Sequence, residues 1–429
     1  MKKKTALILT GLLCALSIVA CGPSDSSSGK KESERTGATS KMVVAISEQQ
    51  EEFYRKVISK YCKLHPEVEV EIETVPFIDN SPTEKMEKNK KAVKDMQVQV
   101  MAGKGPDVFL LDESNQALPD VIKSSYNGVF LDLNTVMEGL EDLPLNQTVL
   151  KAGEVDGKQY FLPLGYMLAG VAVADGTLGD WEPSSGQPAQ FLEEIASHTG
   201  VSGFPTEFFL REYMPGLFGT SALDYEEESI AFSEGLRNLA KRLVEGREFS
   251  SEGAPELPDV TMLGHCRGSV FESLIQRSIA SGTDVKFLPI PNGEGGINAQ
   301  VNVFAAVRAN SPQASQAGDF LAFLLSDEMQ GKTGWEGFGS GTMFTAIPVN
   351  DNAVVPALQY RFGLGTEEPE AAKRKAEELF QITRQVTTAR FCHYENSLVF
   401  QAIFMTSEDR SVEEKLDDLE NELRFYFDE

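Results

Sequence analysis

The chain has 429 residues, of which 41% are hydrophobic, and a formal net charge of −26. A chain of this length is too long to fold around one ordinary hydrophobic core, so two lobes are expected. The acidic balance argues against binding to nucleic acid and against charge-driven adhesion to anionic lipid, because both carry negative phosphates.

The start of the chain has the layout of a bacterial lipoprotein signal peptide. Three lysines (2–4) precede an apolar run (6–19) that is too short for a comfortable membrane span. Small Ala20 directly before Cys21 suits cleavage there and acylation of the thiol. An uncleaved anchor helix is the alternative, but no stop-transfer flank follows. We therefore expect a signal peptide over 1–20 and a lipid-anchored protein on the extracellular face of the cytoplasmic membrane.

The segment after Cys21 is rich in Ser, Gly, Lys and Glu and has no large apolar side chain up to residue 40. Such a segment cannot bury enough surface to offset its ordering entropy. We interpret residues 21–41 as a lipidated flexible tether.

Strand and helix patterns then alternate along the chain. Apolar runs and strict alternation predict strands over Met42–Ile46, Val68–Val75 and Asp107–Leu111. Helical spacing predicts helices over Glu51–Leu64 and Thr83–Ala102, the second with an inner stripe of Met86, Val93, Met96, Val98 and Met101. This β-α-β-α-β order indicates a largely parallel sheet, and ligands bind at the carboxyl ends of such strands. Residues 47–49 and 112–114 should therefore share one rim.

The rest of the chain contains further extended segments and a helical end. Extended structure is predicted over Gln159–Ala174, Asp284–Ile290, Asn298–Val307 and Thr345–Val349. A helix is predicted over Ser311–Leu325, and Glu367–Phe427 is predicted to be helical throughout.

The cysteines that follow Cys21 are few and widely spaced: Cys62, Cys266 and Cys392. At most one disulfide could form among them. Two Cys-His pairs, at 265–266 and 392–393, are adjacent in sequence, whereas zinc ligands usually lie two to four residues apart. We expect neither a metal site nor a cofactor.

Several short motifs occur in an order that is similar to that of a known family. They are AGKGPDV (102–108), GKQYFLP (157–163), PIPNG (289–293), AGDFLAFLLSDEMQ (317–330) and IPV (347–349). With the lipoprotein start, they resemble the extracellular solute-binding proteins of ABC importers, the family that includes maltose-binding protein. The resemblance covers about Met42 to Phe425.

This resemblance implies an α/β, two-lobe periplasmic-binding-protein-like fold of type II, each lobe a mostly parallel sheet flanked by helices. The first lobe would comprise 42–165 and 304–347, and the second 168–302 and 350–429. Hinge crossings would fall near 165–169, 302–305 and 346–350. It further implies a monomer, without enzymatic activity, that carries a sugar or oligosaccharide to ABC permease subunits and contacts the membrane through its lipid alone.

The resemblance also implies ligand-binding residues on both lobes. Those of the first lobe would be Glu48, Gln49, Asp112 and Glu113, and those of the second Thr206, Glu207, Phe208 and Glu272. Carboxylates and amides suit sugar hydroxyls because they form several short hydrogen bonds. Trp335, in a glycine-rich loop, would either offer an apolar platform to the sugar or fill a gap in the first lobe.

Two alternatives stay open. With only two tryptophans, the same fold could serve a non-sugar solute such as a polyamine, a peptide or a metal chelate. A lipid-anchored extracellular glycoside hydrolase is the other alternative: the chain lacks His-Glu-x-x-His and Gly-x-Ser-x-Gly motifs, but a two-carboxylate glycosidase has no such motif.

Replacement of the lipidation cysteine tests the lipoprotein hypothesis. The Cys21→Ser chain should leave the membrane fraction on cell fractionation, because serine offers no thiol to acylate. Cys62→Ser is the matched control and should stay membrane-bound. Retention of Cys21→Ser in the membrane as firmly as the unaltered chain would refute lipidation at this residue.

Overall fold

The computed structural model describes residues 41–78, 82–112, 115, 117–200, 207–245, 260–263, 268–331, 346–365, 367–406 and 410–427. The predicted signal peptide and Cys21 lie outside these ranges. The first strand begins at Lys41, the predicted last residue of the tether and one residue before the predicted strand start at Met42. Within the described ranges, no helix combines the length and apolar character needed to span a bilayer.

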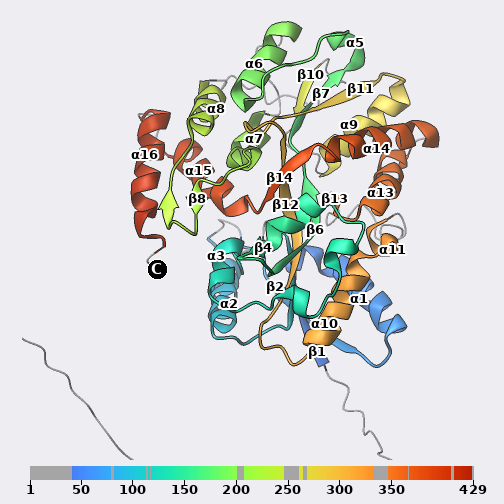
Figure 1. Ribbon diagram of the computed structural model, residues 1–429, viewed down its shortest axis with the longest axis vertical. Helices are drawn as coiled ribbons and strands as arrows, with labels where there is room; N and C mark the ends of the chain where they lie inside the picture. The colour runs from blue at the N-terminus through green and yellow to red at the C-terminus, as the bar shows by residue number, and fades with distance from the viewer. Residues whose placement is uncertain are drawn as a thin grey trace, which may run out of the picture. The chain divides into compact units, whose positions relative to one another are not determined.

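The main sheet contains seven described strands. They are β1 (Lys41–Ser47), β2 (Glu69–Val75), β3 (Val108–Asp112), β6 (Phe161–Met167), β12 (Ile297–Val307), β13 (Ile347–Pro348) and β14 (Val386–Arg390). Their order is β13-β6-β12-β3-β1-β2, and β14 pairs with β12 beyond the end of β3. Figure 1 shows β14 beside β12. Strands β2 and β3 both run parallel to β1, as the βαβ pattern predicts.

The smaller sheet differs from the expectation of mostly parallel strands. It consists of β7 (Gly170–Ala174), flanked by β10 (Val260–Leu263) and β11 (Val285–Pro289), and both pairings are antiparallel. In chain order, β7 follows β6 after two residues, and β11 precedes β12. Because β6 and β12 are antiparallel, their continuations β7 and β11 also run antiparallel. Two short hairpins complete the strands: β4 (Glu154–Val155) with β5 (Lys158–Gln159), and β8 (Leu223–Asp224) with β9 (Ser229–Ile230).

Helices surround these strands. Those that precede β11 are α1 (Glu51–Leu64), α2 (Glu84–Met101), α3 (Val121–Tyr126), α4 (Gln147–Leu150), α5 (Asp175–Leu178), α6 (Pro188–Thr199), α7 (Glu207–Tyr213), α8 (Glu234–Glu245) and α9 (Gly268–Ser281). Those that follow β12 are α10 (Ala314–Leu325), α11 (Asp327–Gln330), α13 (Asp351–Gly363), α14 (Pro369–Thr383), α15 (His393–Phe404) and α16 (Val412–Glu422). The prediction of a wholly helical end is wrong at β14, where β-branched Val386, Thr387 and Thr388 favour a strand.

Helix α2 shows where a sequence stripe and the buried face differ. Its buried residues are Met86, Val93, Met96 and Val100, at helical spacings of seven, three and four. The predicted members Val98 and Met101 are exposed by 62% and 53%, because they point away from that face. The Thr83 hydroxyl accepts a hydrogen bond from the Met86 backbone amide and begins the helix as its N-cap.

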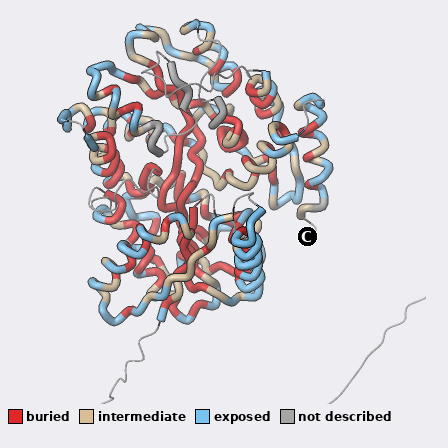
Figure 2. The backbone as a smooth tube through the Cα atoms, turned by 180° about the vertical axis from the view of Figure 1, so that it is seen from behind, coloured by how far each residue is buried: buried red, intermediate tan, exposed pale blue. Residues whose placement is uncertain are grey.

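Two hydrophobic clusters fill the interior. The buried stretches of backbone run through the middle of the fold (Figure 2). The larger, core 1, packs the main sheet against α1, α2 and α10 and extends to α13 and α14. The smaller, core 2, gathers residues of β7, α6, α8, α15 and α16. Strand β12 is buried along its entire length.

The three predicted crossing segments meet at Gly165. This residue pairs with Val303 of β12 on one side and with Pro348 of β13 on the other. A side-chain carbon added at Gly165 would lie 2.7 Å from the Cβ of Ala346 and 3.7 Å from Oδ1 of Asn302. Only a glycine lets the three segments approach this closely.

Gly165→Ala should therefore lower the free energy of unfolding by about 1–3 kcal/mol, because the added methyl group overpacks a buried contact. Thermal unfolding would measure this effect. Gly176→Ala in α5 is the matched control, since no atom lies within 4 Å of the added carbon there, and its midpoint should stay level or rise slightly. Equal midpoints for both variants would contradict the close approach.

Candidate functional site

Two strand ends face each other along one edge of β12. Strand β14 is parallel to β12 and pairs with its residues 297–300, whereas β3 is antiparallel and pairs with residues 303–307. The two strands therefore run toward each other, and their carboxyl ends, Arg390 and Asp112, lie on either side of Val301 and Asn302. The carboxyl ends of strands are where open α/β sheets bind ligands.

A cavity of about 290 Å³ lies at this junction, near the lower end of the range for small-molecule sites. Core 1 contributes Leu118, Val121 and Phe304 to its walls, and core 2 contributes Leu223. Its polar and aromatic lining residues are Asn115, Asp120, Lys151, Glu154, Ser221, Tyr225, Arg390, Phe391, His393, Tyr394 and Glu395. The cavity is thus bounded by both cores, and polar and apolar side chains share its lining.

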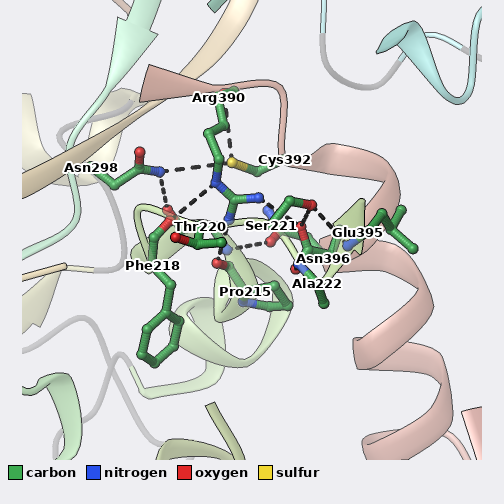
Figure 3. A network of polar contacts seen from close by, with 12 residues as sticks. Pro215, Phe218, Thr220, Ser221, Ala222, Asn298, Arg390, Cys392, Glu395 and Asn396 are labelled. Atoms are coloured by element: carbon green, nitrogen blue, oxygen red, sulfur yellow. Dashed lines mark hydrogen bonds and ion pairs between the residues drawn. The ribbon is translucent and has the colours of Figure 1, made fainter. Parts of the chain in front are cut away.

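Arg390 forms one wall of this cavity through a buried network (Figure 3). Its guanidinium donates to the carbonyls of Pro215 and Phe218 at 2.9 and 3.1 Å and to the Glu395 carboxylate at 2.8 Å. Glu395 also accepts from the Ser221 hydroxyl at 2.9 Å and the Ala222 amide at 3.0 Å. Burial acts to lower the pKa of Arg390, but nearby Cys392 and Glu395 more than offset it and leave the pKa above its ordinary value.

Buried amides extend the network to β12. The Asn298 side chain donates to the Gly216 carbonyl at 2.7 Å, and the Gly216 amide donates to Oδ1 of Asn396 at 2.8 Å. Asn396 in turn donates to Oε1 of Gln300 at 3.1 Å. These bonds hold the turn at 215–217 against β12 and α15, so the cavity wall on this side is rigidly supported.

Asp120 is a second buried carboxylate that lines the cavity, with 7% of its surface exposed. It is the N-cap of α3 and accepts from the Lys123 backbone amide at 2.9 Å. The Tyr225 hydroxyl lies 3.0 and 2.9 Å from its two oxygens, and the Tyr426 hydroxyl donates to it as well. Burial raises the pKa of Asp120 despite these hydrogen bonds.

No cluster suited to a metal ion occurs among the described residues. Cys392 is free and buried, and burial raises the pKa of its thiol to about 11. A thiol of this pKa stays protonated near neutral pH and is a poor metal ligand. Cys62 is also free, whereas His265 and Cys266 lie outside the described ranges.

The structure brings some of the predicted first-lobe residues together at the rim of β1 and β3. Ser47 and Asp112 end these two parallel strands, and the Gln50 side-chain amide donates to the Asp112 carboxylate. Glu48 accepts from the Phe77 amide at 2.9 Å, and Gln49 is exposed. None of Glu48, Gln49 and Asp112 lines the cavity, and their contact with a ligand stays a prediction.

The remaining predicted residues lie apart from the cavity or outside the described part of the chain. Glu272 of α9 forms an ion pair with Arg361 of α13 and is not among the cavity residues. Glu113, Thr206 and Trp335 lie outside the described ranges, as do the side chains of Glu207 and Phe208 at the start of α7.

Sequence reasoning missed Asp120, Tyr225, Arg390 and Glu395. A signal existed for Arg390, since the β-branched run 386–388 marks a strand and Arg390 is its last residue. Asp120, directly before Val121, has the character of a helix N-cap. Tyr225 and Glu395 carry no local signal, because only long-range contacts bring them to the cavity.

Comparisons with solved structures identify the fold. Neither a protein-family model nor a curated protein sequence matches the chain. An extracellular solute-binding protein of family 1 from Alicyclobacillus acidocaldarius is 16% identical, with a TM-score of 0.56, over 90% of this chain and 98% of that one. A putative oligosaccharide periplasmic-binding protein from Synechococcus is 16% identical, with a TM-score of 0.57, over 90% and 99%.

A third structure, an ABC substrate-binding protein from Listeria monocytogenes in complex with cycloalternan, is 14% identical, with a TM-score of 0.55, over 90% of this chain and 99% of that one. At these identities the likeness shows the fold. The chain therefore has the α/β fold of the extracellular solute-binding proteins, as the resemblance implied.

Glu395→Gln tests the buried network. It keeps the side-chain volume but leaves the Arg390 guanidinium without its counter-charge, so unfolding should become easier by about 3–5 kcal/mol. Chemical denaturation would measure this loss. Asp418→Asn is the control: it breaks the exposed ion pair with Arg410 and should leave the midpoint nearly unchanged. A midpoint for Glu395→Gln as high as that of the control would contradict the role of the network.

Proposed function

We propose that this chain is the extracellular solute-binding component of an ABC importer and that it captures a carbohydrate in the cavity between β3 and β14. One observation carries the proposal: two strand ends from opposite directions face each other over β12, and both cores line the cavity between them. Solved proteins of the same fold include several described as binding oligosaccharides.

The cavity chemistry favours a neutral, hydroxyl-rich solute. The charged groups of Arg390 and Glu395, which line the cavity, neutralise each other. Lys151 and Glu154, at the rim, are exposed and have no partner among the described residues. One cation and one anion free to hydrogen bond suit hydroxyl groups, which both donate and accept. Phe391 and Tyr394 supply aromatic surface for the apolar face of a sugar ring.

The mechanism that we propose is closure of two lobes over the solute. The first lobe would comprise 42–165 and 304–347, and the second 168–302 and 350–429. The hinge would lie where three segments meet at Gly165, since few residues there need to change their backbone angles. The closed form, tethered through lipid on Cys21 at the extracellular face of the membrane, would deliver its solute to permease subunits as a monomer.

The proposal is for binding without turnover. Solved proteins of the same fold are mostly binding proteins, although one is described as a designed esterase, 15% identical with a TM-score of 0.53. The buried carboxylates of the cavity are already engaged: Glu395 by Arg390, and Asp120 by tyrosine hydroxyls. A glycosidase needs one carboxyl group to protonate the leaving oxygen and another to act as base or nucleophile.

A panel of solutes tests the function. Neutral oligosaccharides should raise the melting temperature and be recovered unchanged, because a ligand that binds only the native state stabilises it by about 2.7 kcal/mol at a hundred times its Kd. Polyamines, peptides and metal chelates form the other arms of the panel. If only one of these classes raises the melting temperature, that class replaces carbohydrate as the proposed solute. Hydrolysis of the bound sugar would overturn the proposal of binding without turnover.

Rim substitutions then test the cavity. Lys151→Gln and Glu154→Gln should each weaken binding of the identified solute by about ten- to a hundredfold, the equivalent of one charged hydrogen bond of about 1.5–3 kcal/mol. Calorimetry would measure Kd. Lys158→Gln, on β5 outside the cavity, is the matched control and should bind normally. Unchanged affinity in both rim variants would move the site elsewhere, for example to the Asp112 rim.

A further inference from the structure

A cluster of polar and aromatic side chains joins α3 to the end of the chain beside the cavity. Its members, called here the tyrosine latch, are Asp120 and Lys123 on one side and Tyr225 and Tyr426 on the other. Asp120 and Tyr225 also line the cavity. Tyr225 belongs to the β8–β9 hairpin, and Tyr426 follows α16, so the two sides of the latch are far apart in sequence.

The two sides of the latch pack on different cores. Leu118 and Val121, which flank Asp120, belong to core 1. Tyr225 and Tyr426 pack against core 2, where the Tyr426 ring stacks on that of Tyr394 with centroids 5.4 Å apart. The latch therefore spans from one core to the other at the edge of the cavity.

The latch engages both oxygens of the Asp120 carboxylate. One oxygen accepts from the Lys123 amide, and the other accepts from the Tyr426 hydroxyl. The single Tyr225 hydroxyl proton is shared between the two oxygens, which lie at 3.0 and 2.9 Å. Three donors thus occupy most of the roughly four lone-pair sites that a carboxylate offers.

Further contacts reinforce the same bridge. The Lys123 ammonium donates to the Tyr426 carbonyl and lies 3.8 Å from the centre of the Tyr426 ring. The Tyr126 ring stacks on that of Tyr225 with centroids 6.1 Å apart. These interactions are polar or aromatic, and water can replace the partners of each polar group when they separate. A bridge of this kind forms and breaks reversibly.

We propose that the tyrosine latch ties α3 of the first lobe to the β8–β9 hairpin and the chain end of the second lobe and stabilises the closed form before any solute is bound. The proposal rests on the proposed function in taking this cavity as the solute site and in taking two lobes that close over it. Asp120 is then a positioning residue: through its hydrogen bonds to the two tyrosines it sets the population of the closed form. A solute then needs to supply only the remaining part of the closing free energy.

Small-angle scattering on the whole chain without solute tests the latch. The double variant Tyr225→Phe/Tyr426→Phe removes the hydroxyl donors and keeps the rings, so the closed-to-open ratio should fall by about tenfold or more and the radius of gyration should increase. Tyr160→Phe is the matched control, because the Tyr160 ring packs against core 1 and its hydroxyl has no partner among the described residues. Residues 1–40 are the same in all variants and cancel in the comparison.

Asp120→Asn gives a second, independent arm, since it removes the charge while preserving the volume. A larger radius in both arms, with cooperative thermal unfolding retained, supports the latch; a wild-type radius in either arm overturns it. If the double variant loses cooperative unfolding, the radius of gyration of Asp120→Asn alone decides: a larger radius supports the latch and a wild-type radius overturns it. Because no solute is added, a solute panel without any hit would refute the proposed ligand and leave this result unaffected.

Discussion

Strand β12 is the element on which the rest of the structure depends. It is buried along all eleven of its residues and carries β6 on one edge and both β14 and β3 on the other. Because β14 and β3 run in opposite directions, their carboxyl ends meet and neither can continue past the other. The cavity beside Val301 follows from this arrangement rather than from the choice of any single lining residue.

The same strand also explains why the smaller sheet is antiparallel. Strands β6 and β12 are neighbours of opposite direction, and the chain passes from β6 into β7 and from β11 into β12. The chain therefore passes between the two sheets twice, and both passages start or end on neighbouring strands of the main sheet, β6 and β12. The close approach at Gly165 lies on this path and leaves no room for a side chain where β6, β12 and β13 are side by side.

Two polar clusters at the cavity differ in what they connect. The Arg390–Glu395 network ties β14 to the turn at 215–217 and to α15, with the Arg390 side chain 13% exposed and that of Glu395 5%. An ion pair at such a place is strongly held, since breaking it leaves a buried charge without a partner. The tyrosine latch instead joins two cores through the hydroxyl groups of two half-buried tyrosines around the buried Asp120 carboxylate, without a buried ion pair.

Much of the fold was predictable from local patterns. The β-α-β-α-β start, the helix Glu51–Leu64 and the strand near Asn298–Val307 were all predicted within one or two residues, because periodic burial leaves a strong signal in the sequence. Strand β14 was not, since five residues inside a charged, helix-rich end carry little periodicity. The predicted inner stripe of α2 is confirmed at Met86, Val93 and Met96, which are buried, and wrong at Val98 and Met101, which are exposed.

By itself, the sequence determined the class of the fold, the order of its elements and the meeting of the β1 and β3 ends on one rim, because these follow from periodicity and parallel pairing. Only the tertiary structure decided that Arg390 and Asp112 face each other along one edge of β12, that Glu395 neutralises Arg390, and that Asp120 meets Tyr225 and Tyr426. Each of these contacts joins residues separated by long stretches of chain or depends on one short strand, and neither local propensity nor spacing encodes such a juxtaposition.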